Sequence, residues 1–169
     1  MLRRYQKVDG YAVAPAEAET VLGLYVDVET TGLDSRQDAI IELGYVAFEF
    51  DRDGNVYQLL ESDSFFEDPG RPIPAAITRL TTITDADVAG RRLPDDHITS
   101  LVERAGLVVA HNADFDRRFL ERRFPSFETR AWACSARDVP WRAEGFEGPK
   151  RQYRSMTAGF LYSGTTPVW

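Results

Sequence analysis

The 169-residue sequence is poor in the features that stabilise secreted proteins or cross membranes. Cys134 is its single cysteine, so an internal disulfide is excluded and a reducing compartment is expected. No apolar run approaches the roughly 18 residues that a membrane span needs. The first 20 residues also lack the apolar stretch of a signal peptide. We therefore expect a cytoplasmic protein with no membrane partner.

Positive charge is scarce as well. The 20 lysine and arginine residues are outnumbered by 27 acidic residues, which gives a formal net charge of −7. An acidic chain gains little from its overall charge in binding nucleic acid. A phosphodiester would have to be held locally, by metal ions or by a small basic patch.

The chain is long enough for one domain with its own core. Residues 1–20 are polar and rich in alanine and proline, so we expect a loose lead-in before a domain over residues 21–169. Three prolines in the segment 67–74 predict a loop there. The apolar patterns predict strands at 21–28, 39–50, 56–66, 107–111 and 130–134, a short helix after Thr84, and helices at 95–104 and 113–124. This order predicts an α/β fold with a mixed five-stranded sheet flanked by helices.

Two acids lie close to the end of the first expected strand. Asp27 and Glu29 are two residues apart, so they share a face of the strand, with Cα atoms roughly 6.6 Å apart. Two carboxylates at that spacing can bracket a pair of metal ions about 3.5–4 Å apart. Acids are also common at solvated strand ends, and the pair alone fits either interpretation. The small residues Thr30–Gly32 that follow allow a ligand to approach the backbone, and Leu33 would supply an apolar wedge.

A second acidic group begins the helix expected at 113–124. Asn112 is suited to capping this helix, and Asp114 and Asp116 fall in its first turn. Both acids would complement the helix dipole. That explanation is weaker for Asp116, which faces the carboxyl end of a strand, where open α/β sheets place their sites. The arginines at 117, 118, 122 and 123 are more typical of a solvated face than of a phosphate clamp.

The segments VDVETTGL (26–33) and HNADFDRRFL (111–120) resemble, in order, the first two motifs of the DEDD superfamily of 3′–5′ exonucleases. Those motifs are Asp-x-Glu followed by Thr-Thr/Ser-Gly, and Asn-x-x-Phe-Asp. The segments 67–90 and 134–150 are similar to the corresponding parts of proteins that resemble the proofreading epsilon subunit of bacterial DNA polymerase III. The resemblance extends over roughly residues 20–164.

The resemblance implies a ribonuclease H-like exonuclease fold and hydrolysis of the 3′-terminal phosphodiester of DNA with two Mg²⁺ or Mn²⁺ ions, in replication proofreading or repair. It implies that Asp27, Glu29 and Asp116 are catalytic metal ligands, in keeping with the preference of hard cations for oxygen. The residues implied to bind the terminal nucleotide are Thr30, Thr31, Leu33, Asn112 and Phe115. The implied partner is a nucleic acid 3′ end, single-stranded DNA first and RNA second, with a DNA polymerase subunit as a further partner.

The third motif of this family is not matched. It consists of a histidine base and, about five residues later, an aspartate ligand, and it follows the segment that here reads MTAGFLYSG (156–164). His97 and His111 both precede that place, and His111, at the end of a buried strand, is expected to be structural. The tyrosine variant of the motif is unmet at Tyr153 and Tyr162.

We therefore expect an exonuclease domain that is incomplete at its C-terminal end, without its last helix. Because a general base contributes about 10²–10⁴-fold, we expect weak or no cleavage. The alternatives are a nuclease-dead module that binds single strands or a polymerase, and a nonfunctional fragment. Each of them shares the same three acids.

Overall fold

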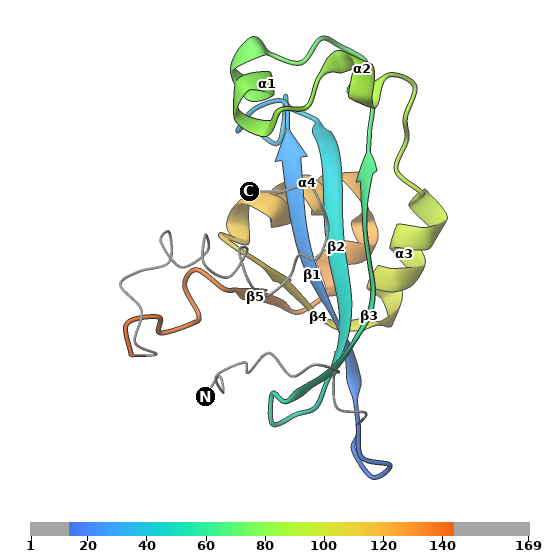
Figure 1. Ribbon diagram of the computed structural model, residues 1–169, viewed down its shortest axis with the longest axis vertical. Coiled ribbons are helices and arrows are strands. Elements are labelled where there is room, and N and C mark those ends of the chain that lie inside the picture. The colour runs from blue at the N-terminus through green and yellow to red at the C-terminus, as the bar shows by residue number, and fades with distance from the viewer. Residues whose placement is uncertain (1–13, 144–169) are drawn as a thin grey trace.

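A long antiparallel meander begins the part of the chain that the computed structural model describes, residues 14–143 (Figure 1). Its strands are β1 (Val21–Thr30), β2 (Ile40–Phe50) and β3 (Val56–Phe66). The turn between β2 and β3 is built on Asp51, whose carboxylate accepts hydrogen bonds from the backbone of Asp53 and Asn55 and from the Tyr57 hydroxyl. Gly54 takes the positive φ of 81° that this turn requires.

Two further strands complete a mixed sheet of five strands in the order β3-β2-β1-β4-β5. Both β4 (Ala105–Ala110) and β5 (Trp132–Cys134) run parallel to their neighbours, β4 beside β1 and β5 beside β4. The expected five-stranded mixed sheet is therefore confirmed. β4 begins earlier than the sequence indicated, because Gly106 continues the strand. A Cβ at Gly106 would overlap the side chain of Val21, so glycine allows β4 to lie against β1.

Helices cover the sheet and cap one of its ends. They are α1 (Ala75–Thr81), α2 (Asp85–Val88), α3 (Asp95–Arg104), α4 (Asp114–Arg123) and the 3₁₀ helix η1 (Pro125–Thr129). α3 and α4 pack against β1 and bury the main core between helices and sheet. α1 and α2 lie beyond the Thr30 end of β1, at the top of Figure 1. A smaller cluster of Ile41, Ile73, Ile83 and Val88 joins them to β2.

Three details differ from the expectations. Helix α1 follows the proline-rich loop directly, because Pro74 is its N-cap residue and leaves the helix interior free of proline. Pro125 ends α4 as expected but also starts η1. The expected capping by Asn112 is wrong: Ala113 is the N-cap residue of α4, and Asn112 precedes it in the left-handed region with φ of 60°.

The expected N-cap at Thr84 is confirmed. Its backbone N–H and its hydroxyl both donate to the Asp87 carboxylate, at 2.8 and 2.6 Å.

No helix within residues 14–143 is long and apolar enough to cross a membrane. Residues 14–20 form no strand or helix. The expected absence of a last helix concerns residues outside the described ones, and so does the expected place of the third motif.

Candidate active site

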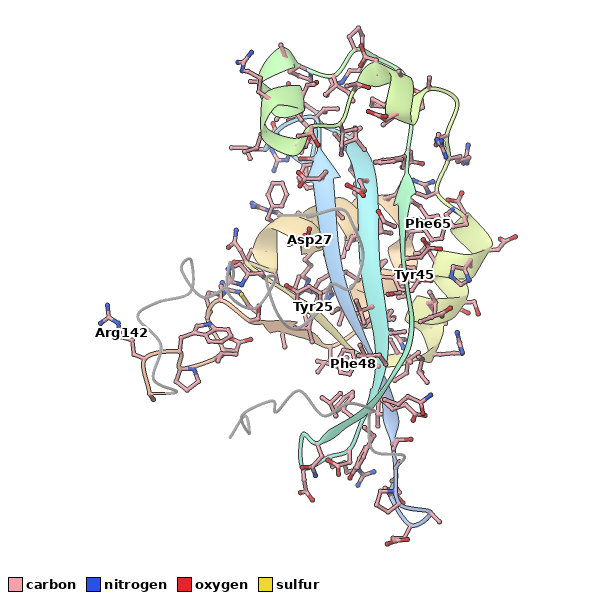
Figure 2. All side chains as sticks on the ribbon, in the orientation of Figure 1. Tyr25, Asp27, Tyr45, Phe48, Phe65 and Arg142 are labelled. Atoms are coloured by element: carbon pink, nitrogen blue, oxygen red, sulfur yellow. The ribbon has the colours of Figure 1, made fainter. Side chains whose placement is uncertain are left out.

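The structure brings the two acidic motifs together. Asp27 and Glu29 lie on the central strand β1, where they alternate with the core residues Val26 and Val28 and so point to the opposite face; Figure 2 labels Asp27. Asp116 lies in the first turn of α4. Its Oδ1 atom accepts a hydrogen bond of 3.0 Å from the backbone N–H of Val28, 88 residues away in the sequence. One bond thus fixes the start of α4 against the strand that carries the other two acids.

These carboxylates are poorly hydrated and repel one another. Asp116 is only 2% exposed, Glu29 is buried, and Asp27 is half-buried. Burial, and then the charge of Glu42, raises the pKa of Asp27 to about 7. Burial, followed by the charges of Asp27, Glu42 and Asp116, raises the pKa of Glu29 to about 9. Burial and the charge of Asp27 raise the pKa of Asp116 to about 8. Ionising the whole cluster therefore requires a compensating positive charge.

Glu42 is a fourth acid of this cluster that the sequence argument missed. It lies on β2 directly opposite Glu29, and it is buried. The Ser64 hydroxyl of β3 donates to its carboxylate, and burial raises its pKa. The available signal was an acid between Ile41 and Leu43, in a strand whose only other charged residue is Glu49. The register that sets Glu42 against Glu29 required the three-dimensional pairing.

The donor set of the cluster fits a hard divalent cation. The Oε1 atom of Glu29 is buried and has no hydrogen-bond partner. Within residues 14–143, no lysine or arginine forms an ion pair with Asp27, Glu29, Glu42 or Asp116. Carboxylate oxygens are the ligands that Mg²⁺ and Mn²⁺ prefer. In the described part of the chain, however, no three His, Cys, Asp or Glu side chains are gathered closely enough to hold an ion. The cluster thus supplies the charge and the oxygen atoms, and its side chains would have to converge on binding.

The expected nucleotide-binding residues either follow Glu29 in the chain or precede Asp116. Leu33 is 82% exposed in the loop after β1. The Thr30 hydroxyl donates to the Gly32 carbonyl at 2.6 Å, so it shapes this loop. The carbonyl of Asn112 accepts the N–H of Phe115 at 2.9 Å, and the half-buried Phe115 ring packs on Phe119, with 5.0 Å between centroids.

The remaining polar residues of the second motif serve the fold. His111 bonds the Ser135 hydroxyl through Nδ1 at 3.1 Å, and burial lowers the pKa of His111, in agreement with the expected structural role. Asp114 is exposed and accepts two bonds from Arg137. The four arginines of α4 all donate to protein acceptors: Arg117 to Glu121, Arg118 to Asp114, Arg122 to Asp38, and Arg123 to Glu67 and Asp95.

Comparison with known proteins identifies the family of this chain. The pattern of the exonuclease family, RNase_T, matches residues 24–137. The chain is 41% identical over 98 residues to a PolC-type DNA polymerase III of Clostridium perfringens, covering 57% of this chain and 6% of that protein. It is 33% identical over 122 residues to the PolC-type DNA polymerase III of Caldanaerobacter subterraneus, and this match covers 69% of this chain and 8% of that protein. The chain therefore spans a small fraction of the length of these relatives.

Solved structures share the fold. Exonuclease X in complex with 5′ overhanging duplex DNA superposes with a TM-score of 0.56 and 24% identity, covering 86% of this chain and 76% of that one. Escherichia coli exonuclease I in complex with a dT13 oligonucleotide superposes with a TM-score of 0.53 and 18% identity, and the match covers 68% of this chain and 28% of that one. A zinc-bound form of that enzyme with single-stranded DNA has the same TM-score of 0.53 and the same identity of 18%, and the match covers 69% of this chain and 28% of that one. The chain thus has the ribonuclease H-like exonuclease fold and belongs to the exonuclease family, in agreement with its resemblance to the DEDD superfamily of 3′–5′ exonucleases.

Proposed function

We propose that this chain supplies the site of a cytoplasmic, metal-dependent exonuclease that removes nucleotides from the 3′ end of DNA in replication proofreading or repair. The observation that carries the proposal is the buried cluster of Asp27, Glu29 and Asp116, fixed by the bond between Asp116 and Val28. Like charges this close are unfavourable without a cation. The names of the relatives and the DNA in the structural neighbours support DNA as the substrate and a polymerase as the partner.

Each acid has a role that its surroundings allow. Asp116 holds the Val28 N–H through Oδ1, which leaves Oδ2 for a cation. Glu29 offers its unpartnered Oε1 atom, and Asp27 shares with Glu29 the same face of β1. Two bound Mg²⁺ or Mn²⁺ ions would activate the attacking water and stabilise the leaving oxygen.

The terminal nucleotide would bind beside these acids. Leu33 is the exposed apolar side chain available to a base or sugar. The backbone of Thr30 and Thr31 would hold the terminal sugar, and Asn112 and Phe115 would bind from the turn before α4.

We expect slow cleavage by the 169 residues alone. His97 bonds the Tyr45 hydroxyl at 2.8 Å, and Figure 2 shows Tyr45 beside Phe65, on the part of the sheet that faces α3. His111 bonds Ser135. With both histidines engaged in this way, the described residues offer no free imidazole as general base, a contribution of about 10²–10⁴-fold.

The test is hydrolysis of a single-stranded oligonucleotide labelled at its 5′ end, with Mn²⁺ or Mg²⁺. We expect a ladder of products shortened from the 3′ end. Asp27→Ala should abolish the ladder, whereas Asp114→Ala, which removes an exposed acid of the same site region, should leave it intact. A folded protein that binds the oligonucleotide in a metal-dependent way without cutting it would favour the binding module. A folded protein that neither binds nor cuts would refute the proposal.

A further inference from the structure

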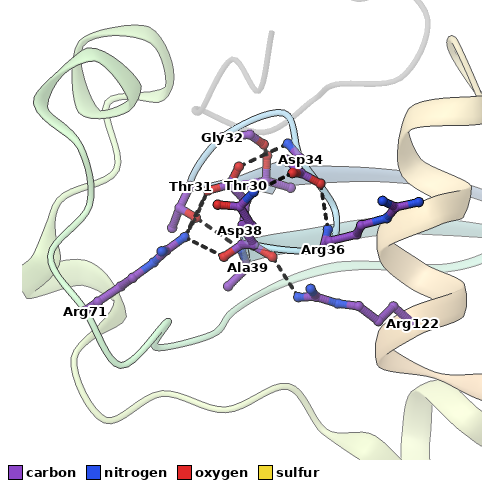
Figure 3. Close-up of polar contacts among 10 residues, drawn as sticks. Thr30, Thr31, Gly32, Asp34, Arg36, Asp38, Ala39, Arg71 and Arg122 are labelled. Carbon is purple, nitrogen blue, oxygen red and sulfur yellow. Dashed lines mark hydrogen bonds and ion pairs between the residues drawn. The ribbon is translucent and has the colours of Figure 1, made fainter.

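The loop between β1 and β2 is folded around the carboxylate of Asp38 (Figure 3). This carboxylate accepts the Asp34 N–H at 3.0 Å and the Thr31 hydroxyl at 3.1 Å. Backbone bonds from Thr31 to Ala39 and from Asp38 to Asp34 close the loop, at 2.9 and 2.7 Å. A Cβ at Gly32 would overlap the Asp38 carboxylate, so the chain approaches it as closely as glycine allows.

The hydroxyl of Thr31 is fully used inside this loop. It donates to Asp38 and accepts from the Ala39 N–H at 3.1 Å and from Arg71 at 2.8 Å. A hydroxyl has one donor and two acceptor positions, so none is left for a ligand. The side chain of Thr31, which is buried, therefore serves the shape of the loop.

Two arginines from distant segments tie this loop to the rest of the site. Arg71, in the loop before α1, uses its Nη2 atom for three bonds: to Thr31, to the Asp38 carboxylate at 2.9 Å, and to the Gln37 carbonyl at 3.0 Å. Arg122 of α4 donates to the Asp38 carbonyl at 2.7 Å. Figure 3 shows the two guanidinium groups approaching Asp38 from different elements. Because α4 also carries Asp116, Arg122 links the loop to the helix that completes the carboxylate cluster.

What this network holds in place is an exposed leucine. Leu33 lies between Gly32 and Asp34, and the loop begins directly after the strand that carries the metal-binding acids. A loop that is already ordered loses less conformational entropy when a ligand binds. We propose that Asp38, Arg71 and Arg122 are positioning residues that hold Leu33 and the adjacent backbone ready for the 3′-terminal nucleotide. This inference rests on the function proposed above for the same site.

The test uses Arg71, because all three of its bonds come from one nitrogen. The lysine ammonium has three donors at a single point, so Arg71→Lys should keep the network, and Arg71→Met should lose it. Arg52→Met removes the same charge from the turn at the opposite end of β2 and serves as the control. Affinity is measured by fluorescence anisotropy with Ca²⁺ for a linear oligonucleotide and for a circular one that has no 3′ end.

We expect Arg71→Met to weaken binding of the linear oligonucleotide about tenfold, the scale of a few lost ordering contacts, with little change for the circle. In hydrolysis with Mn²⁺ it should raise KM more than it lowers kcat. Arg71→Lys and Arg52→Met should stay within about twofold of wild type, and Arg122→Met should show a smaller loss of the same kind.

The outcomes separate this inference from the proposed function. If wild type neither binds nor cleaves, the proposed function fails, and this inference fails with it. If wild type does both and Arg71→Met matches it, only this inference is overturned. Equal losses for the linear and circular strands, or no rescue by Arg71→Lys, would also overturn it, because they would indicate a general effect on folding or charge.

Discussion

Replacing Asp116 by asparagine should stabilise the metal-free protein while it removes a proposed metal ligand. The amide oxygen of asparagine can still accept the Val28 N–H, the bond that ties α4 to β1. What the substitution deletes is a carboxylate that is 2% exposed and whose pKa is raised to about 8, by burial first and by the charge of Asp27 second.

The sign of the effect follows from proton binding. In the unfolded chain Asp116 ionises near its ordinary pKa of 3.8, whereas in the folded protein it keeps its proton up to about pH 8. Folded molecules therefore bind more protons than unfolded ones between these values, and the free energy of unfolding falls as the pH rises through this window. The difference between 3.8 and about 8, at ~1.4 kcal/mol per pH unit, sets a ceiling of about 5 kcal/mol at pH 8. At pH 5 the same calculation leaves about 1.5 kcal/mol.

Urea unfolding at pH 5 and pH 8 in the presence of EDTA measures this directly. At pH 8 the free energy of unfolding of Asp116→Asn should exceed that of wild type by several kcal/mol, up to about 5. At pH 5 the difference in this free energy should be much smaller. Asp114→Asn, which removes an exposed acid from the same turn, should change stability by about 1 kcal/mol or less. Excess Mn²⁺ should then stabilise wild type and not Asp116→Asn. A variant that is no more stable than wild type at pH 8, or whose advantage is independent of pH, would refute the electrostatic account of the site.

Three further outcomes can be checked by thermal or urea unfolding and by the hydrolysis assay. Gly32→Ala should destabilise the protein by about 1–3 kcal/mol and impair binding of the strand end, because the added Cβ would overlap Asp38. Gly44→Ala is the control, because its added Cβ would meet only a backbone oxygen at 3.9 Å. Arg123→Met should lower stability by about 1–3 kcal/mol, because its guanidinium bonds Glu67 of the loop after β3 and a carboxylate at the start of α3; unchanged unfolding would contradict this. Mn²⁺ at about 100 times its Kd should stabilise wild type by about 2.7 kcal/mol, and an equal gain in Asp27→Ala would show that the ion binds elsewhere.

The sheet could be predicted because its strands carry strong local signals. β1, β2 and β3 are runs rich in β-branched and aromatic residues separated by turn residues. Helix α1 could not be predicted in the same way, since prolines dominate the sequence just before it and Pro74 proves compatible with a helix start. The early start of β4 depended on close packing of Gly106 against Val21, a contact between segments far apart in the sequence.

The acids of the site were predictable for a related reason. Asp27, Glu29 and Asp116 break the apolar pattern at the ends of core elements, and strand alternation places the first two on one face. Glu42 breaks the pattern in the same way, but its place beside Glu29 depends on the strand register. The bonds of Asp38 to Arg71 and Arg122 span 33 and 84 residues. Exposed polar side chains leave no periodic signal, so such contacts appear only in three dimensions.

Two unfavourable features of this fold lie next to each other, and together they favour the ligand proposed above. The carboxylate cluster around Asp27 and Glu29 destabilises the folded state as the pH rises, and a divalent cation would relieve that cost. Directly after it, Leu33 leaves a large apolar side chain in water on a loop that arginines keep ordered, and an apolar surface would cover it. Sequences depart from favourable local choices mainly at functional sites. A cation alone satisfies only the first feature, and an apolar molecule only the second. The end of a nucleic acid strand, with a phosphate to bind the cations and a base to cover the leucine, satisfies both.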